Sequence, residues 1–253
     1  MSKLYYETFG SGPPLVLVHG LGGSGQWWLH NIEPLSWHFT LYVVDLPGFG
    51  RSAPTCSLVQ LVSYLPAWLD EVGLERVQIV GHSMGGYLVQ HLAATQPERV
   101  ERLVLMGTLG VPLYAKTHDM VLRFLSELEN IPLPFWPTMI SDGLHAGIPA
   151  LWRLTDEICK LDARPLMAQI QVPTLILWGE HDWLLPVEMG IKMAHLIPKA
   201  SFYVIENAGH NVMIDQPEAV NQHLLDFLSK ERRLKESAPQ AGLFQKLRKA
   251  IRE

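Results

Sequence analysis

The pentapeptide GHSMG at residues 81–85 is the clearest candidate for chemistry in this chain. An apolar run, Val77–Val80, leads directly into it, and a segment with helical spacing follows. A serine between two glycines at a tight strand-to-helix turn is held with its hydroxyl exposed, which is the geometry of a nucleophile. The helix that starts there also favours nearby negative charge. We therefore predict that Ser83 is a nucleophile and that Gly86 lets the helix approach the sheet.

A serine hydroxyl is a weak nucleophile unless a neighbouring base takes its proton. Of the eleven histidines, His210 lies in a loop, ENAGH, directly after the last predicted strand. That position puts it at the same edge of a parallel sheet as Ser83, so we predict His210 as the general base. His82, beside the serine, is expected to be structural. The histidines expected within helices are His91, His195 and His223, and those expected to be able to line a pocket are His118 and His145.

A carboxylate is needed to orient the histidine and to stabilise its charged form. The segment LILWGEHD places two acids after the preceding strand, Glu180 and Asp182. We predict Asp182, because the turn after Gly179 should bring the third residue inward, and Glu180 is the alternative. Asp45 also ends a predicted strand, but we expect it to brace its own loop.

Negative charge that develops on a substrate oxygen needs backbone N–H donors aimed at it. One predicted donor is the N–H of Met84, directly after the serine. The other is the N–H of Leu21, in the glycine-rich loop HGLGG that follows the first core strand. His19, which opens that loop, is expected to anchor it.

Several large apolar side chains are candidates for a substrate pocket. The tryptophans in this set are Trp27, Trp28, Trp136, Trp152 and Trp183. Such a lining suits aliphatic or aryl acyl groups, although each of these residues can equally be part of a core. Three arginines, Arg123, Arg153 and Arg164, leave a carboxylate-bearing substrate open.

These residues need a scaffold that brings loop ends together, and the apolar runs predict one. Short runs rich in β-branched residues are typical of strands buried on both faces of a parallel sheet. They are 15–18, 41–44, 77–80, 103–106, 174–178 and 202–205. Amphipathic segments at 58–71, 85–95, 187–196 and 217–228 lie between or after them and predict helices. The alternation predicts an α/β fold with helices on both faces of the sheet.

Residues 111–170 interrupt this alternation with helix-like pieces, six prolines and no convincing strand. We expect a helical cap there, with residues 1–110 and 171–230 forming the α/β core. Residues 231–253 are predicted to be a separate basic tail with an amphipathic end. The tail carries seven Lys or Arg and three Glu, which suggests weak contact with an anionic membrane or a partner, against a solvated or self-packed tail.

The composition excludes several classes. A net charge of -5 over 253 residues gives no nucleic-acid footprint, and two cysteines provide neither a disulfide framework nor a metal cluster. No metal or organic cofactor is expected. The N-terminus lacks the apolar region of a signal peptide and no run of about 18 apolar residues exists, so we expect a cytoplasmic protein. The sequence does not indicate an oligomeric state.

The strings HGLGGSGQWW, DLPGFGRS, GHSMGG, LILWGEHDWLLP and NAGHNVMIDQPEAVNQHLLDFL resemble the α/β-hydrolase superfamily, in particular its small esterase-like members. The resemblance covers about residues 4–229. It implies an eight-stranded, mostly parallel sheet with a helical cap inserted after the sixth strand, and the chain order serine, acid, histidine. The expected activity is hydrolysis of carboxylic esters of apolar or aryl acyl groups through an acyl-enzyme.

Within this family, dehalogenases and epoxide hydrolases carry aspartate where this chain has Ser83. The C–C bond hydrolases often carry an aromatic residue where this chain has Asn211, which disfavours that activity without excluding it. Lactonases, perhydrolases and acyltransferases stay open, because the fold alone does not separate them. A non-catalytic ligand receptor on the same fold is a further alternative, which an intact triad disfavours.

Overall fold

The computed structural model describes residues 4–52 and 56–229. These residues form one sheet in the order β1-β3-β2-β4-β5-β6-β7, in which β1 is antiparallel to β3 and every other pair is parallel. The strands are β1 (Tyr5–Phe9), β2 (Pro14–Val18), β3 (Thr40–Asp45), β4 (Val77–His82), β5 (Val100–Met106), β6 (Thr174–Gly179) and β7 (Ala200–Ile205). The mostly parallel α/β architecture is confirmed. The sheet has seven strands in these residues where eight were expected, so the insertion follows the fifth strand instead of the sixth.

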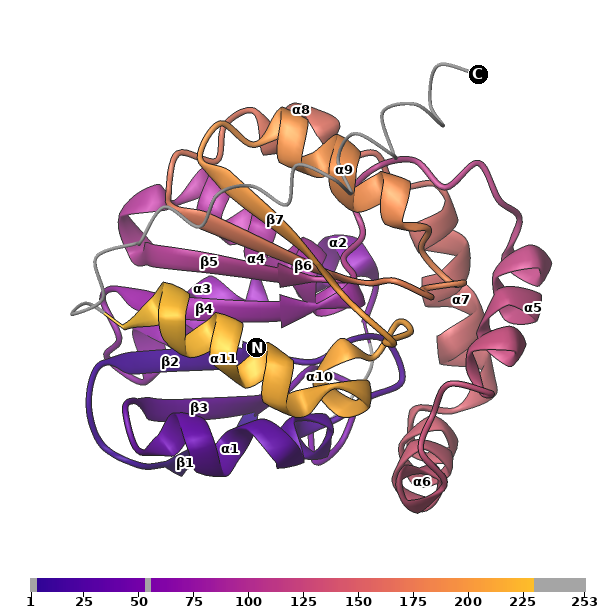
Figure 1. Cartoon of the computed structure of the whole chain (residues 1–253), viewed down its shortest axis with the longest axis horizontal. Helices are drawn as coiled ribbons and strands as arrows, with labels where there is room; N and C mark the ends of the chain where they lie inside the picture. The colour runs from indigo at the N-terminus through magenta and orange to yellow at the C-terminus, as the bar shows by residue number, and fades with distance from the viewer. Residues whose placement is uncertain (1–3, 53–55, 230–253) are drawn as a thin grey trace.

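Both faces of the sheet are covered, which explains why the strands are continuous apolar runs. On β2, Val16 and Val18 pack into one core cluster and Leu15 and Leu17 into another, because successive side chains point to opposite faces. Figure 1 shows α1 and α11 in front of the sheet and α3 and α4 behind it. The helices of these layers are α1 (Leu29–Ser36), α2 (Leu58–Leu61), α3 (Tyr64–Glu71), α4 (Ser83–Thr95), α9 (Val187–Leu196), α10 (Val212–Asp215) and α11 (Pro217–Leu228), and the short 3₁₀ turns are η1 (Gly25–Trp28) and η2 (Pro97–Arg99).

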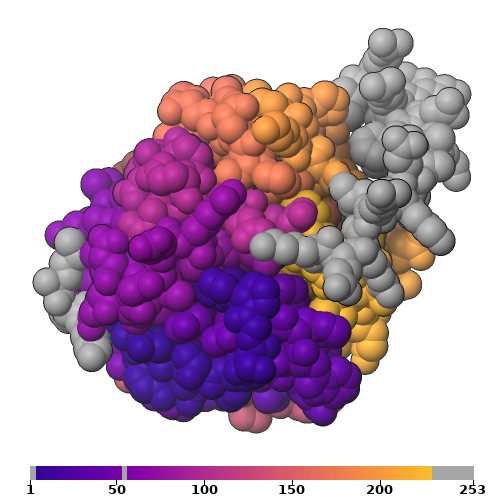
Figure 2. Space-filling view, turned by 90° about the vertical axis from the view of Figure 1, so that its left-hand side faces the viewer, coloured from indigo at the N-terminus to yellow at the C-terminus, as the bar shows by residue number. Residues whose placement is uncertain are grey.

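The residues expected to form the cap, 111–170, contain helices and no strand, and all of them are described. The elements are α5 (Thr117–Glu127), η3 (Leu133–Phe135), α6 (Trp136–Ala146), α7 (Ile148–Cys159) and α8 (Arg164–Met167). In Figure 1, α5, α6 and α7 lie beyond the sheet on the side toward which the arrows of β4 and β5 point. Figure 2 looks onto the opposite end of the molecule, where those strands begin.

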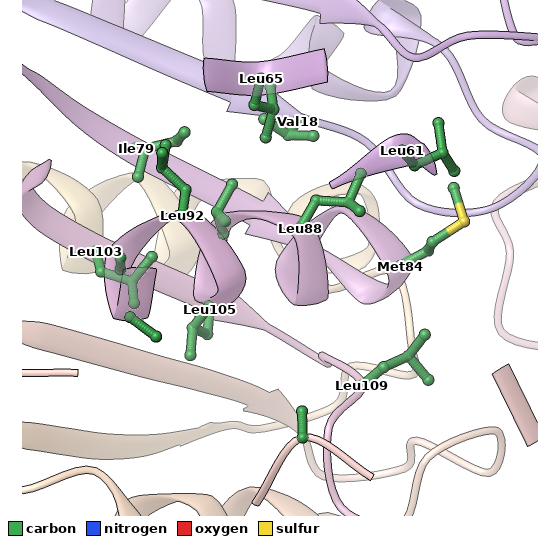
Figure 3. Packing of buried hydrophobic residues seen from close by; sticks show 14 of the residues in the cluster. Val18, Leu61, Leu65, Ile79, Met84, Leu88, Leu92, Leu103, Leu105 and Leu109 are labelled. Atoms are coloured by element: carbon green, nitrogen blue, oxygen red, sulfur yellow. The ribbon is translucent and has the colours of Figure 1, made fainter. Parts of the chain in front are cut away.

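Helix α4 is the element that carries the serine, and its packing fixes where the serine lies. Leu88 and Leu92 point from α4 toward side chains of the sheet and of neighbouring helices, as Figure 3 shows. The other labelled members of this cluster are Val18, Leu61, Leu65, Ile79, Met84, Leu103, Leu105 and Leu109. A fully buried leucine contributes about 1.5–3 kcal/mol to folding, so this interface holds α4 firmly against the sheet.

No helix in residues 4–52 and 56–229 is both long and apolar enough to cross a membrane. The predicted basic tail, residues 231–253, lies outside the described residues, so its proposed contact with an anionic membrane or a partner stays a prediction.

Candidate active site

The serine sits at a strained turn between β4 and α4. Ser83 has a φ of 52°, a left-handed conformation that a residue with a side chain rarely adopts. The turn closes so tightly that a Cβ on Gly81 would lie 2.7 Å from the carbonyl oxygen of Gly85. A Cβ on Gly85 would lie 2.3 Å from the carbonyl oxygen of His19. Both glycines are therefore required by close contact.

The structure brings the three predicted triad residues together. The Nε2 atom of His210 lies 3.0 Å from the Oγ of Ser83, and its Nδ1 lies 2.9 Å from Oδ2 of Asp182. All three residues are buried, with exposures between 5% and 8%. In the neutral imidazole, an Nδ1–H that donates to Asp182 leaves Nε2 free to take the serine proton. This geometry suits nucleophilic catalysis by Ser83.

Asp182 is held in position from its other side. Its Oδ1 accepts a hydrogen bond of 2.7 Å from the backbone N–H of Leu185, which leaves Oδ2 for the histidine. The alternative acid, Glu180, is exposed and accepts a hydrogen bond from the backbone N–H of Asn207. The turn that starts at Gly179 thus directs Asp182 inward and Glu180 outward.

His210 lies among three carboxyl groups and one imidazole. Burial lowers its pKa, but the charge of Asp182, its hydrogen bond, and the charges of Glu127 and Asp215 outweigh burial, so the pKa is raised above 6.5. The ring of His82 lies 4.8 Å from that of His210, and Nε2 of His82 is 3.1 Å from the carbonyl oxygen of His210. Burial, followed by the nearby charge of His210, lowers the pKa of His82 well below 6.5, which suits a neutral, structural ring.

The loop after β2 lies directly beside the serine. A Cβ on Gly20 would be 2.9 Å from the Cβ of Ser83, so this loop and the turn after β4 are in contact. His19 anchors the loop: its Nε2 accepts from the N–H of Leu46 at 2.9 Å and its Nδ1 lies 2.7 Å from the carbonyl oxygen of Gly20. The loop that contains Leu21 therefore lies beside the serine, and the role of the Leu21 N–H as an oxyanion donor stays a prediction.

The second predicted donor, the N–H of Met84, belongs to the first turn of α4. The first four N–H groups of a helix have no partner within the helix, so this N–H is available to a substrate oxygen beside the serine. Asp45 braces the neighbouring loop, as expected, by accepting hydrogen bonds from the N–H groups of Gly25 at 2.7 Å and Arg51 at 2.8 Å.

A profile of the alpha/beta hydrolase family matches residues 15–223 of this chain. The chain belongs to that family. Its relatives include a 2-hydroxy-6-oxononadienedioate/2-hydroxy-6-oxononatrienedioate hydrolase of Paraburkholderia phymatum, 30% identical over 89% of this chain and 91% of the relative. Another is a pimeloyl-[acyl-carrier protein] methyl ester esterase of Vibrio vulnificus, 27% identical over 90% of this chain and 99% of the relative.

Among solved structures, a thermophilic esterase from Thermogutta terrifontis superposes with a TM-score of 0.76. It is 26% identical, and the match covers 89% of this hydrolase and 92% of the esterase. These relatives are named for different substrates, so they support a hydrolase of the α/β family and leave the reaction to be argued from the site.

The five tryptophans considered for the pocket have different surroundings in this hydrolase. The side chain of Trp28 has no solvent exposure (0%). It belongs to the core cluster that also contains residues of α1 and α11, so its role is packing. Trp152 and Trp183 are exposed, at 53% and 60%. Trp136 is partly buried, and its Nε1 donates to the carbonyl oxygen of Ile131.

Trp27 lies beside His82 and forms a hydrogen bond with the cap. Its ring lies 6.2 Å from that of His82, and its Nε1 donates a 2.9 Å hydrogen bond to Oδ2 of Asp142 on α6. The Oγ of Ser24 donates to the same oxygen at 2.8 Å. Asp142 thus ties the cap to the residues that follow the oxyanion loop. Leu151 of α7 reaches the same loop, 3.5 Å from the Cβ position of Gly22.

The cap histidines and arginines considered for the pocket are exposed or form bonds with the protein itself. His118 and His145, considered as pocket residues, are both exposed. Nη1 of Arg123 donates to the carbonyl oxygen of Leu184, Nη2 of Arg153 to that of Cys56, and Arg164 pairs with Asp162. These arginines therefore form bonds with the protein itself and do not indicate a carboxylate-binding subsite.

Three buried or partly buried acids around the site, Glu127, Asp142 and Asp215, were not anticipated. Glu127 and Asp142 come from cap helices, and their partners lie far away in the chain, so no local spacing marks them. Asp215 follows the histidine by five residues and accepts the N–H of Gly209 at 2.9 Å. Proximity to the histidine loop was the only available signal for Asp215.

A hollow of about 570 Å³ lies at the other end of β4, near residues 69–76, Glu98 and Arg99. Its lining residues lie at the amino end of β4, whereas Ser83 follows the carboxyl end, so the hollow is separate from the triad. Within residues 4–52 and 56–229, no group of three or more His, Cys, Asp and Glu side chains could hold a metal ion.

Proposed function

We propose that this chain is a serine hydrolase that cleaves carboxylic esters of uncharged apolar or aryl acids through an acyl-enzyme intermediate. The observation that carries the proposal is the hydrogen-bonded chain from Ser83 through His210 to Asp182, with distances of 3.0 and 2.9 Å. The strained backbone of Ser83 supports it, because strain of this kind persists where a function requires it.

The proposed reaction has two steps. Ser83 Oγ attacks the ester carbonyl while Nε2 of His210 takes its proton, and the N–H groups of Leu21 and Met84 stabilise the oxyanion. The C–O bond then breaks and His210 gives the proton to the leaving alcohol. Water, deprotonated by His210, attacks the acyl-serine, releases the acid and restores Ser83. Asp182 holds the imidazole tautomer and stabilises the imidazolium throughout.

Hydrolysis of a C–C bond is the second candidate, favoured by the relative from Paraburkholderia phymatum. The substrate in that relative's name is a dioate, which carries two carboxylates. Here the three arginines considered for such a group bond to the protein, and the histidine lies beside the carboxyl groups of Asp182 and Glu127. Negative surroundings disfavour an anionic substrate near the base, so uncharged esters fit this site better.

The test is a panel of p-nitrophenyl esters graded by acyl length, measured with the unmodified enzyme, with Ser83→Ala, and with Ser126→Ala. Ser126 is an exposed serine on α5 and serves as the matched control. We expect Ser83→Ala to lower kcat by at least about 10⁴, because triad members act as a unit, and Ser126→Ala to behave as the unmodified enzyme.

A fluorophosphonate should label Ser83 and no other serine. Near-normal turnover by Ser83→Ala, or labelling elsewhere, would refute the assignment of the nucleophile. Faster cleavage of 2-hydroxy-6-oxononadienedioate, the substrate in the name of the Paraburkholderia phymatum relative, than of any ester would favour the C–C bond reaction. Very slow turnover of both would favour a ligand receptor.

A further inference from the structure

Glu127 connects the cap to both loops that carry the acid and the base. It is the last residue of α5 and is only 2% exposed. Its Oε1 accepts hydrogen bonds from the backbone N–H groups of Trp183 and Leu184, the second at 3.1 Å. Its Oε2 accepts a 3.0 Å hydrogen bond from the backbone N–H of His210. One carboxylate therefore joins the two residues after Asp182 to the histidine itself.

The surroundings hold this carboxylate in one place. A buried charge is costly unless its oxygens are hydrogen-bonded, and here both oxygens accept bonds from fixed backbone donors. Asn130 lies beside it, with Nδ2 3.4 Å from Oε2. A Cβ on Gly209 would lie 2.8 Å from the same oxygen, so the close approach of the histidine loop depends on glycine. A contact this specific between cap and core is more than general packing.

We propose that Glu127 is a positioning residue that sets the acid loop and the histidine loop against each other, so that the cap forms part of the catalytic apparatus. The proposal rests on the proposed function of Ser83, His210 and Asp182. Glu127 touches neither Ser83 nor the imidazole; it acts through the backbone of the loops that carry the acid and the base. Its removal frees both loops at once, and a misplacement of about 1 Å in such a site costs about 10²-fold in rate.

Glu127 also acts on His210 through its charge, and this gives a separate readout. The groups that face the imidazole are Asp182 from the loop after β6, Glu127 from α5, Asp215 from α10 and His82 from β4. Loss of the Glu127 charge removes one of the carboxylates that raise the pKa of His210. The acid limb of the kcat/KM profile should then move to lower pH, since catalysis needs neutral His210. A residue that only fills space would not move it.

The experiment compares Glu127→Gln and Glu127→Ala with Glu129→Gln, which removes an exposed carboxylate two residues away. We measure kcat and KM on a short p-nitrophenyl ester across the pH range, with circular dichroism to count folded protein. Glu127→Ala should lower kcat by about 10² and change KM by less than about threefold, because the loops move and the pocket stays. Glu127→Gln keeps one acceptor oxygen and should recover part of kcat, but with the acid limb shifted. Glu129→Gln should match the unmodified enzyme.

A second arm titrates the imidazole of His210 by NMR in the absence of substrate. A lower pKa of His210 in Glu127→Gln than in Glu129→Gln supports the proposal even if esters prove not to be the substrate, in which case the proposed function alone fails. The proposal is overturned if folded Glu127→Gln shows unchanged kcat and an unchanged His210 titration. It is equally overturned if every loss of activity equals the loss of folded protein.

Discussion

Asp215 should make this protein less stable as the pH rises. The pKa of its carboxyl is raised from 3.8 to about 7, mainly by burial and further by the charges of Glu127 and Asp182. The hydrogen bond from the N–H of Gly209 and the charge of His210 lower it by less. The Oδ1 atom is buried and accepts no hydrogen bond from a described residue. The ionised form is therefore disfavoured in the folded state.

The sign and size follow from linkage between protonation and folding. The folded protein holds this proton more tightly than the unfolded chain, so the penalty is absent below about pH 3.8 and complete above about pH 7. A difference of about 3 in pKa, at 1.36 kcal/mol for each, corresponds to about 4 kcal/mol in the free energy of unfolding. Between about pH 4.5 and pH 8 the change is about 3 kcal/mol, because part of the penalty is already present at the lower pH.

Asp215→Asn removes the charge and keeps an oxygen for the N–H of Gly209. Urea unfolding gives the free energy of unfolding of both proteins at about pH 4.5 and pH 8. The difference between the variant and the unmodified protein should be about 3 kcal/mol more in favour of the variant at pH 8 than at pH 4.5. Glu218→Gln, which changes an exposed carboxylate on α11, is the control and should gain nothing. A difference that stays constant with pH, or that falls as the pH rises, refutes the reasoning. A direct NMR titration of the Asp215 carboxyl decides the matter if the variant folds poorly.

Two other substitutions test the acid and the turn. Asp182→Asn should keep the fold and lower kcat by about 10⁴, because the imidazole then adopts the wrong tautomer. Glu180→Gln should change kcat only slightly. If a steady-state assay shows the larger loss for Glu180→Gln, Glu180 is the acid. Gly86→Ala puts a Cβ 1.9 Å from Oγ1 of Thr108 and should cost about 1–3 kcal/mol in urea unfolding. Gly143→Ala, whose Cβ would meet nothing within 4 Å, should leave the free energy of unfolding unchanged or raise it by up to about 1 kcal/mol. Equal destabilisation by Gly86→Ala and Gly143→Ala would contradict the close contact of Gly86 with Thr108.

The parts of the fold that could be predicted are those in which one local signal decides the conformation. The six apolar runs all became strands, and the helices predicted at 187–196 and 217–228 have those bounds in the structure. The edge strand β1 pairs antiparallel with β3, and its side chains, none of them fully buried, give a weaker signal than a fully buried run. The predicted helix at 58–71 is two helices, α2 and α3.

The elbow could be predicted because its sequence pattern is local, although the structure shows that Gly85 is required by contact with His19 and Gly86 by contact with Thr108, both outside the turn. The proximity of Ser83, Asp182 and His210 followed from positions at strand ends, since parallel strands bring those ends to one edge. Neighbouring residues without such a constraint could not be separated: Trp27 and Trp28 are adjacent in η1, yet one bonds to the cap and the other is buried among α1 and α11. Which side a short 3₁₀ turn presents depends on tertiary packing.

The cap acids Asp142 and Glu127 are the clearest examples of site residues that could not be predicted from the sequence. Asp142 and Glu127 lie on helices with ordinary amphipathic patterns, and an acid on such a helix is usually exposed to solvent. Only the folded chain shows that Asp142 accepts from Ser24 and Trp27, and that Glu127 accepts from His210 and the residues after Asp182. Each acid reaches a different side of the site. Substitutions within the cap should therefore affect kcat as well as substrate preference, because the cap holds the loops on which catalysis depends.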